Sequence, residues 1–423
     1  MGSSIVKELP ELVENNVITP EMAKAIEHYY ADKKGGGNQL LIFGGLGSVL
    51  TGLGIILIFA HNWDDFSRGT KTFLALLPLV LSQVATGYSL IKDKPRLWKE
   101  VSGLLLFFSV GAAIALISQI YNMPGEESSY ILMWVVLCFP LMYILRSDAL
   151  AFMHLAFSTF YAVVTGYFNP HAPWLYLVLL AILIPYYVNQ LKQGAESYIA
   201  SIFNSLIPLS LIIALGAFIS GADEFGFVIY ITFLCLLYNI GLLPYFSKYT
   251  YGWNGYLNVG RVGIAVLLLS TSFRFFWRAT VTQPAPELYF ILLCIAFFGG
   301  ALYFGFKAAK GRFRPDIYQC MIIIFPVIYI IGTRHDYVAA VLNNLLVLVL
   351  GVLAIRDGAA RVDFSMLNFG LLIISALIIS RFFDTNISFA IRGILFIAVG
   401  AGFFAGNYLV SKKRKQFTKN QQP

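Results

Sequence analysis

Charged residues are scarce in this chain of 423 amino acids, and their scarcity excludes a soluble protein. Only 12% of the residues are Asp, Glu, Lys or Arg, about half the share that is usual in soluble domains. Hydrophobic residues make up 58% of the chain, and the mean hydropathy is +0.73. Too little polar surface remains to cover a water-soluble globule of this length. The composition therefore predicts an all-α, polytopic bundle of transmembrane helices.

Cysteine is also rare, and the common catalytic and cofactor motifs are missing. Cys138, Cys235, Cys294 and Cys320 all lie inside apolar runs without a CxxC spacing, which argues against a disulfide framework and a zinc site. The sequence contains no Walker A motif, no HExxH, no GxSxG and no CxxCH. We therefore predict no catalytic residue, no metal site and no cofactor, and interpret the cysteines as small buried hydrophobic residues.

We also predict no cleavable signal peptide, because residues 1–38 are polar and lack an apolar core segment. Thr19 suits the N-cap of a helix that has Pro20 at its first position, and a second short helical segment precedes it. We predict a cytoplasmic N-terminal helical hairpin that three glycines at residues 35–37 join to the bundle. The hairpin is either a docking element for an unidentified protein partner or a cap on the bundle.

Long apolar runs fill the rest of the chain. A transmembrane helix needs roughly 20 mostly apolar residues, and this criterion predicts about 14 spans between residues 39 and 410, followed by a basic cytoplasmic tail at residues 411–423. The predicted spans are Leu40–Ala60, Thr72–Ile91, Val101–Ile120, Ile131–Leu145, Ala151–Tyr167, Leu175–Val188, Tyr198–Ile219, Gly226–Phe246, Leu257–Phe273, Leu288–Phe306, Ile317–Gly332, Val338–Ile355, Phe364–Ser380 and Ile387–Leu409.

Basic residues are distributed unevenly between the two predicted sides of the membrane. With the N-terminus inside, the inside segments hold 22 of the 30 Lys and Arg residues, and the outside loops hold six. The positive-inside rule then predicts that both termini lie in the cytoplasm. Because this orientation explains the net charge of +8, we predict a lipid bilayer as the partner of the basic residues, and no nucleic acid.

A reporter enzyme that is active only outside the cytoplasm tests this orientation. We expect no activity when the reporter follows Lys415, because the tail carries five of the inside basic residues. The same reporter inserted after Glu224, in a predicted outside loop, should be active and serves as the control. Strong activity after Lys415 would reverse the orientation.

Six tryptophans fall at the predicted ends of spans. Trp63, Trp134, Trp174 and Trp277 lie at outer ends, and Trp98 and Trp253 lie at inner ends. Tryptophan is enriched where a helix meets the lipid headgroups. We therefore predict that these side chains form two interfacial belts.

Two arginines, Arg261 and Arg392, lie inside predicted spans, where a charge costs at least about 2.5 kcal/mol at the membrane centre. A guanidinium cannot lose its proton to avoid this cost, so each needs an anion, carbonyl groups or water. We interpret both as candidate contacts for the phosphate or carboxylate of a ligand. Alternatively, Arg261 reaches lipid phosphates and Arg392 pairs with Asp384, and neither binds a ligand.

His154 and three amides are the further candidate ligand contacts. We interpret His154, Gln83, Asn239 and Asn343 as polar side chains that line a cavity within the bundle. The alternative for the histidine is a hydrogen bond to a neighbouring carbonyl. For the amides it is interhelical hydrogen bonding, at about 0.6 kcal/mol for each bond.

Carboxylates are missing from the depth of the predicted spans, which disfavours a carrier driven by protons through buried acids. Acidic pairs such as Asp64 and Asp65 lie instead in predicted outside loops. Membrane glycosyltransferases that use lipid-linked donors place acidic residues in their first outer loop. Here that loop has only about eleven residues, with no outer domain to hold an acceptor. An enzyme is therefore the least favoured class.

Four motifs resemble one bacterial family in order and spacing. They are Leu12–Ala23, Gly52–Asp64, Ala113–Gly125, and Trp134 followed by Pro140–Ser147. Over residues 8–165 the chain resembles the predicted membrane proteins grouped as domain of unknown function 2157. The resemblance implies a bacterial inner membrane protein, and it implies no activity.

Three function classes fit these observations. A carrier or flippase for an anionic small molecule or amphiphile accounts for the arginines and amides within spans and for the prolines that interrupt them. A non-transporting scaffold or sensor accounts for the cytoplasmic hairpin and for the missing carboxylate. A polytopic glycosyltransferase is the third class. We favour the carrier or flippase.

Overall fold

The structure is a computed structural model, and it describes most of the chain between residues 63 and 384. Within that range the described residues exclude 170, 193–196, 247–253, 282–284 and 310–314. Residues 9–26, without 11 and 16, and six positions between 397 and 408 are also described. The chain divides into two compact units, Met1–Leu77 and Pro78–Pro423. We describe each unit by itself.

The first unit contains the segment for which the hairpin is predicted. Residues 12–14 and 20–26 are helical, and the Thr19 hydroxyl accepts a hydrogen bond of 3.3 Å from the backbone N–H of Met22. This bond confirms Thr19 as the N-cap. The helical turn η1 (Trp63–Asp65) follows, and α4 (Arg68–Ile91) begins in this unit and ends in the second. The predicted span Leu40–Ala60 and the glycine joint lie outside the described residues.

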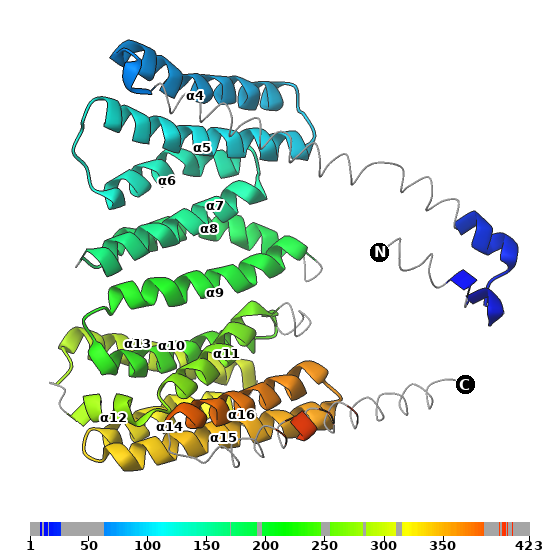
Figure 1. The fold of residues 1–423 in the computed structure, drawn as a ribbon, viewed down its shortest axis with the longest axis vertical. Coiled ribbons are helices and arrows are strands. Elements are labelled where there is room, and N and C mark those ends of the chain that lie inside the picture. The colour runs from blue at the N-terminus through cyan, green and yellow to red at the C-terminus, as the bar shows by residue number, and fades with distance from the viewer. Residues whose placement is uncertain are drawn as a thin grey trace. The chain divides into compact units, whose positions relative to one another are not determined.

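The second unit consists of helices, and its described residues contain no β-strand (Figure 1). After α4, the elements are α5 (Arg96–Ile120), α6 (Glu127–Ile144), α7 (Asp148–Val163), the π-helical η2 (Val164–Phe168), α8 (Trp174–Lys192), α9 (Tyr198–Phe218), η3 (Asp223–Phe225), α10 (Gly226–Gly241), α11 (Gly255–Ser270), α12 (Arg274–Val281), α13 (Leu288–Ala309), α14 (Ile317–Gly332), α15 (Asp336–Arg361) and α16 (Phe364–Asp384). The all-α class is therefore confirmed for the described chain.

Each of the predicted spans between Thr72 and Ser380 coincides with an apolar helix. Ten described helices are long and apolar enough to cross a membrane, or eleven if the bent pair α11 and α12 counts as one span, and α14 is a shorter apolar helix of 16 residues. The fourteenth predicted span, Ile387–Leu409, and the basic tail lie outside the described elements. The structure thus supports a polytopic bundle without confirming fourteen spans.

The outward faces of the helices are apolar. On α13, for example, Leu288, Leu292, Ile295 and Phe306 are all more than half exposed. A monomeric soluble protein rarely exposes apolar side chains over so large an area. These surfaces therefore fit contact with the hydrocarbon of a bilayer.

Two large clusters of buried side chains form the core of the second unit. One is centred on Phe107, Met142 and Phe203. It contains residues from each helix between α5 and α9 and from one face of α10. The other is centred on Ile264 and Phe325, and it joins the opposite face of α10 to α11, α14 and α15. Helix α10 therefore contributes several residues to each cluster, and α11 and α13 also contribute to both.

Trp277 corrects the prediction of interfacial belts. It is fully buried, its indole N–H donates to the carbonyl of Thr271 at 2.7 Å, and its ring packs against the backbone of Gly332. Trp134 is half-buried and donates to the carbonyl of Phe107 at 2.8 Å. Trp98 and Trp174 are exposed, as an interfacial position requires. Position at the end of a span therefore does not decide which way a tryptophan faces.

The chain bends by 79° between α11 and α12. Two consecutive amides of α15 compensate for the interrupted helix: Asn343 donates to the carbonyl of Leu268 at 2.9 Å, and Asn344 donates to that of Ser272 at 2.9 Å. Irregular backbone at membrane depth needs such partners because lipid offers none.

Candidate functional site

The turn between α6 and α7 brings charged residues to the ends of several helices. The backbone N–H of Arg146 bonds to the carbonyl of Tyr143 at 3.3 Å, and that of Ser147 bonds to Met142 at 3.1 Å. This pair of bonds is a Schellman motif, which places Arg146 in the left-handed region with φ of 51°. Glycine usually occupies this position. Ser147 then caps α7, accepting a 3.2 Å bond from the backbone N–H of Leu150.

Glu100 of α5 binds the first turn of α7. Its carboxylate accepts from the backbone N–H groups of Asp148 at 3.0 Å and Ala149 at 3.1 Å, and from the Ser147 hydroxyl. The first N–H groups of a helix have no partner within it, and the helix dipole favours a negative charge there. Glu100 therefore fastens α7 to α5.

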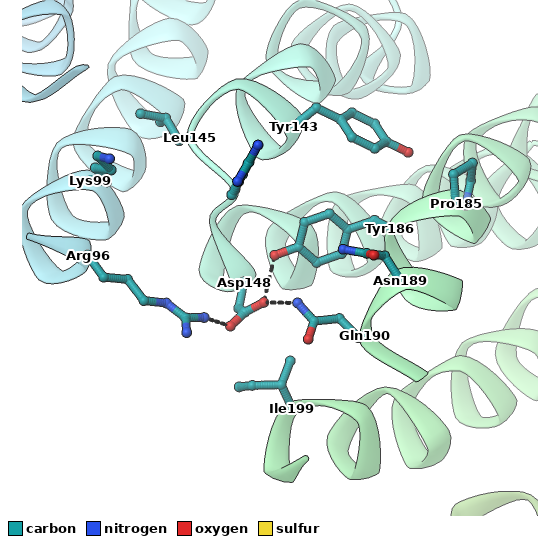
Figure 2. A pocket seen from close by; sticks show the side chains of 11 residues that line it. Arg96, Lys99, Tyr143, Leu145, Asp148, Pro185, Tyr186, Asn189, Gln190 and Ile199 are labelled. Atoms are coloured by element: carbon teal, nitrogen blue, oxygen red, sulfur yellow. Dashed lines mark hydrogen bonds and ion pairs between the residues drawn. The ribbon is translucent and has the colours of Figure 1, made fainter. Parts of the chain in front are cut away.

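Asp148, the first residue of α7, is buried with only 6% of its side chain exposed. Figure 2 shows its carboxylate accepting from three side chains on two other helices. Oδ1 accepts from the Tyr186 hydroxyl at 2.6 Å and from the Gln190 amide at 2.8 Å, both on α8, and Oδ2 pairs with the Arg96 guanidinium of α5. Buried carboxylates are expensive unless such donors satisfy them.

A pocket of about 790 Å³ opens beside this carboxylate. Its polar lining comes from α5, the α6–α7 turn and α8, and its apolar lining includes Pro185 and Ile199 (Figure 2). The lining residues are Arg96, Lys99, Tyr143, Leu145, Arg146, Asp148, Pro185, Tyr186, Asn189, Gln190 and Ile199. Three basic residues and one acidic residue thus surround a hollow of the size that small ligands occupy.

The three basic residues differ in how far their charge is already compensated. Lys99 bonds to Asp93 at 2.6 Å, and its ammonium holds the pKa of that exposed carboxyl below the ordinary value. Arg96 pairs with Asp148, yet 67% of its side chain is exposed. Arg146 is exposed as well. The pocket therefore offers two accessible guanidinium groups, which match the oxygens of carboxylates and phosphates.

Arg261 lies elsewhere, buried between α11 and α16. Its guanidinium donates to the Asn258 amide oxygen at 2.8 Å and to the Met366 sulfur at 2.9 Å. Its charge lies 5.5 Å from the centre of the Phe369 ring, an attractive cation–π distance. Arg261 faces the bundle interior rather than lipid. A ligand contact there stays a prediction, as does one at Arg392, which lies outside the described residues.

The remaining predicted residues are dispersed and do not converge on this pocket. His154 donates from Nε2 to the carbonyl of Leu179 at 2.8 Å. Asn239 accepts from Gln319 at 2.6 Å and donates to the carbonyl of Ala301 at 3.0 Å. Gln83 is on the exposed face of α4. The contacts of Asn239, like those of Asn343 at the bend, match the alternative of interhelical hydrogen bonding, and that of His154 matches the alternative of a bond to a carbonyl.

Sequence reasoning missed Asp148 because the residue lies between two predicted spans, in a segment that hydropathy assigns to a connector. The structure instead makes it the buried first residue of α7. One local signal was available, since a serine before an acidic residue is a common helix start. Nothing local indicates that Arg96, 52 residues earlier, pairs with it.

Comparison with known proteins supports the membrane assignment for part of the chain. No curated protein and no solved structure matches the sequence. One family model matches residues 10–151, about one third of the chain, and its range includes Arg96, Glu100, Arg146 and Asp148. The N-terminal third, with these charged residues of the α5–α7 junction, thus matches the family described as predicted membrane protein (DUF2157).

Proposed function

We propose that this membrane protein is a carrier or flippase for an anionic small molecule or amphiphile, and that the pocket at Arg96 and Arg146 binds the anionic group. The supporting observation is the hollow of about 790 Å³ that contains two accessible guanidinium groups at the ends of membrane-spanning helices. Positive charge in a concave, low-dielectric surface concentrates anions. The Arg261 contact predicted from the sequence would be a separate site.

The pocket suits a ligand with both an anionic and an apolar part. Leu145, Pro185 and Ile199 contribute apolar surface, and the Asn189 amide and the Tyr143 side chain add polar groups. A carboxylate or phosphate can bind a guanidinium through two parallel hydrogen bonds. By the positive-inside rule, Arg96, Lys99 and Arg146 belong to inside segments, so the proposed pocket faces the cytoplasm of a bacterial inner membrane protein.

Neutral substitutions at the two arginines test the proposal. We expect Arg96→Gln together with Arg146→Gly to weaken anion binding at least about tenfold, equivalent to about 1.4 kcal/mol. Glycine is chosen because it relieves the left-handed backbone at residue 146 while it removes the charge. Binding is measured with the purified full-length protein by calorimetry and by ligand-dependent thermal stabilisation. The probes are inorganic sulfate and dihexanoyl-phosphatidylglycerol.

Arg356→Gln is the matched control, since Arg356 is an exposed residue of α15 that does not line the pocket. Equal affinity in the control and in the pocket variant would contradict the proposal. Transport is then measured in proteoliposomes, by uptake of labelled sulfate and by flipping of a fluorescent phosphatidylglycerol. Movement of the probe that requires Arg96 and Arg146 supports a carrier or flippase.

A sensor or scaffold is the second candidate, and the N-terminal hairpin favours it. Leu9, Pro10, Val13 and Ala23 line a groove on the hairpin together with Glu14 and Lys24, and Met22 beside it in the sequence is 54% exposed. Such a groove suits a partner helix. Anion binding without movement of either probe across the membrane would support this second candidate.

A further inference from the structure

The carboxylate of Asp148 is already paired with the guanidinium of Arg96, which is a group that the anionic ligand would bind. The ion pair joins a buried group to an exposed one, because 6% of the Asp148 side chain and 67% of the Arg96 side chain are exposed. Asp148 is further held by Tyr186 and Gln190. Arg96 has a long side chain at the first position of α5. If the pair opens, Arg96 is therefore the partner that moves.

Charged and titratable groups approach Asp148 from every element packed around it. Helix α5 contributes Arg96, Lys99 and Glu100; α6 contributes Tyr143; the turn contributes Arg146; and α8 contributes Tyr186 with the amides of Asn189 and Gln190. Glu100 is engaged with the backbone of α7 and also lies 3.5 Å from Nε of Arg96. Arg96 thus lies between two carboxylates, and only Asp148 is deeply buried.

We propose that Asp148 competes with the ligand for Arg96, and that protonation of Asp148 releases Arg96 to bind the anion. This inference rests on the proposed anion pocket. In the step, a hydronium ion in the pocket transfers a proton to Oδ2 of Asp148 and becomes water, and the ion pair with Arg96 breaks. The guanidinium keeps its charge and turns to the ligand, while Tyr186 and Gln190 still donate to Oδ1. One proton taken up thus accompanies one anionic charge bound.

Thermodynamic linkage fixes the direction of the coupling. If protonation strengthens anion binding, anion binding must favour protonation by the same factor. The anion and the proton therefore enter the pocket together, and a gradient of protons can drive accumulation of the anion. The chain would then be a proton-coupled carrier. Its buried carboxylate would be Asp148, which the sequence alone did not reveal.

The test compares wild type with Asp148→Asn at about pH 5.5 and about pH 8, on either side of neutral. The probe is inorganic sulfate, whose charge is constant over this range. We expect wild type to bind sulfate about tenfold more tightly at the lower pH. Asp148→Asn should bind tightly at both, because its neutral amide leaves Arg96 available and keeps a hydrogen-bonding group of nearly the same shape.

A second probe separates the two sources of such an anion. The phosphodiester of dihexanoyl-phosphatidylglycerol also keeps its charge over this range. Tighter binding of the lipid than of sulfate, with the same dependence on pH, assigns the pocket to a lipid headgroup. Tighter binding of sulfate assigns it to a free oxyanion. Either result supports the proposal if Asp148→Asn removes the dependence on pH.

Tyr186→Phe provides a variant that keeps the charge of Asp148. Losing the hydroxyl that donates to Oδ1 changes how Asp148 is held, so the dependence of sulfate affinity on pH should differ from that of wild type. This measurement decides the question if Asp148→Asn does not fold. Sulfate affinity that is independent of pH in wild type, or equally dependent on pH in Asp148→Asn, overturns the coupling. Failure of the Arg96 and Arg146 variants to weaken binding overturns the pocket itself.

Discussion

Replacing Trp277 by alanine is expected to lower the free energy of unfolding by about 3–5 kcal/mol. The side chain is fully buried, its ring lies beside Phe276 and Phe325, and it packs against Gly332 so closely that a Cβ there would lie 2.4 Å from a ring carbon. The substitution leaves a cavity that the surrounding helices cannot fill. It also removes the donor to the carbonyl of Thr271 at the α11–α12 bend.

Thermal unfolding in one detergent measures this loss, with Trp98→Ala as the matched control. Trp98 is 61% exposed, and we expect its replacement to change stability by no more than about 0.5 kcal/mol. Trp277→Phe should fall between the two because it keeps most of the ring volume. Equal losses for Trp277→Ala and Trp98→Ala would contradict the buried position of Trp277.

Gly255→Ala is expected to destabilise the bundle by about 1–3 kcal/mol, because it forces α11 away from α9. A Cβ at Gly255 would lie 2.2 Å from the carbonyl oxygen of Asn204. The obstacle is backbone, so no side chain can rotate to relieve it. The same close approach recurs at Gly260, where a Cβ would meet the backbone of Tyr238 at 2.7 Å.

Gly299→Ala is the control, and its effect should have the opposite sign. Gly299 lies inside α13, and a Cβ added there would have no atom of another residue within 4 Å. Alanine should therefore leave stability unchanged or raise it by about 0.5–1 kcal/mol through its better helix propensity. Thermal unfolding of both variants in the same detergent gives the comparison. A similar loss of stability in Gly255→Ala and Gly299→Ala would contradict the close backbone contact at Gly255.

Hydropathy predicted the helices well because the length and polarity of a span follow from the thickness and chemistry of the bilayer. The same argument could not place Trp277. Hydropathy assigns a residue to the end of a span, whereas the 79° bend after α11 turns Trp277 inward. Whether a side chain points inward or outward from its helix depends on where the neighbouring helices lie. Tertiary packing sets that arrangement.

The pocket was less predictable than the spans. The sequence places three of its charged residues, Arg96, Arg146 and Asp148, in predicted connectors. They come close together only because of the Schellman turn after α6 and because Glu100 binds the start of α7. Tyr186 and Gln190 come from a helix that starts 26 residues after Asp148. By contrast, Asn239 looked like part of a cavity, and the structure places it in an interhelical hydrogen bond.

The shared carboxylate of Asp148 also has a mechanical consequence. Together with Glu100 it joins α5, α7 and α8 through charge-assisted hydrogen bonds. We expect helices joined in this way to move together rather than against one another. If protonation of Asp148 frees Arg96 as proposed, α5 loses one of its links to α7 and keeps the one through Glu100, while α8 stays attached. The charge state of one side chain would thus set how tightly α5 is held to the other two helices.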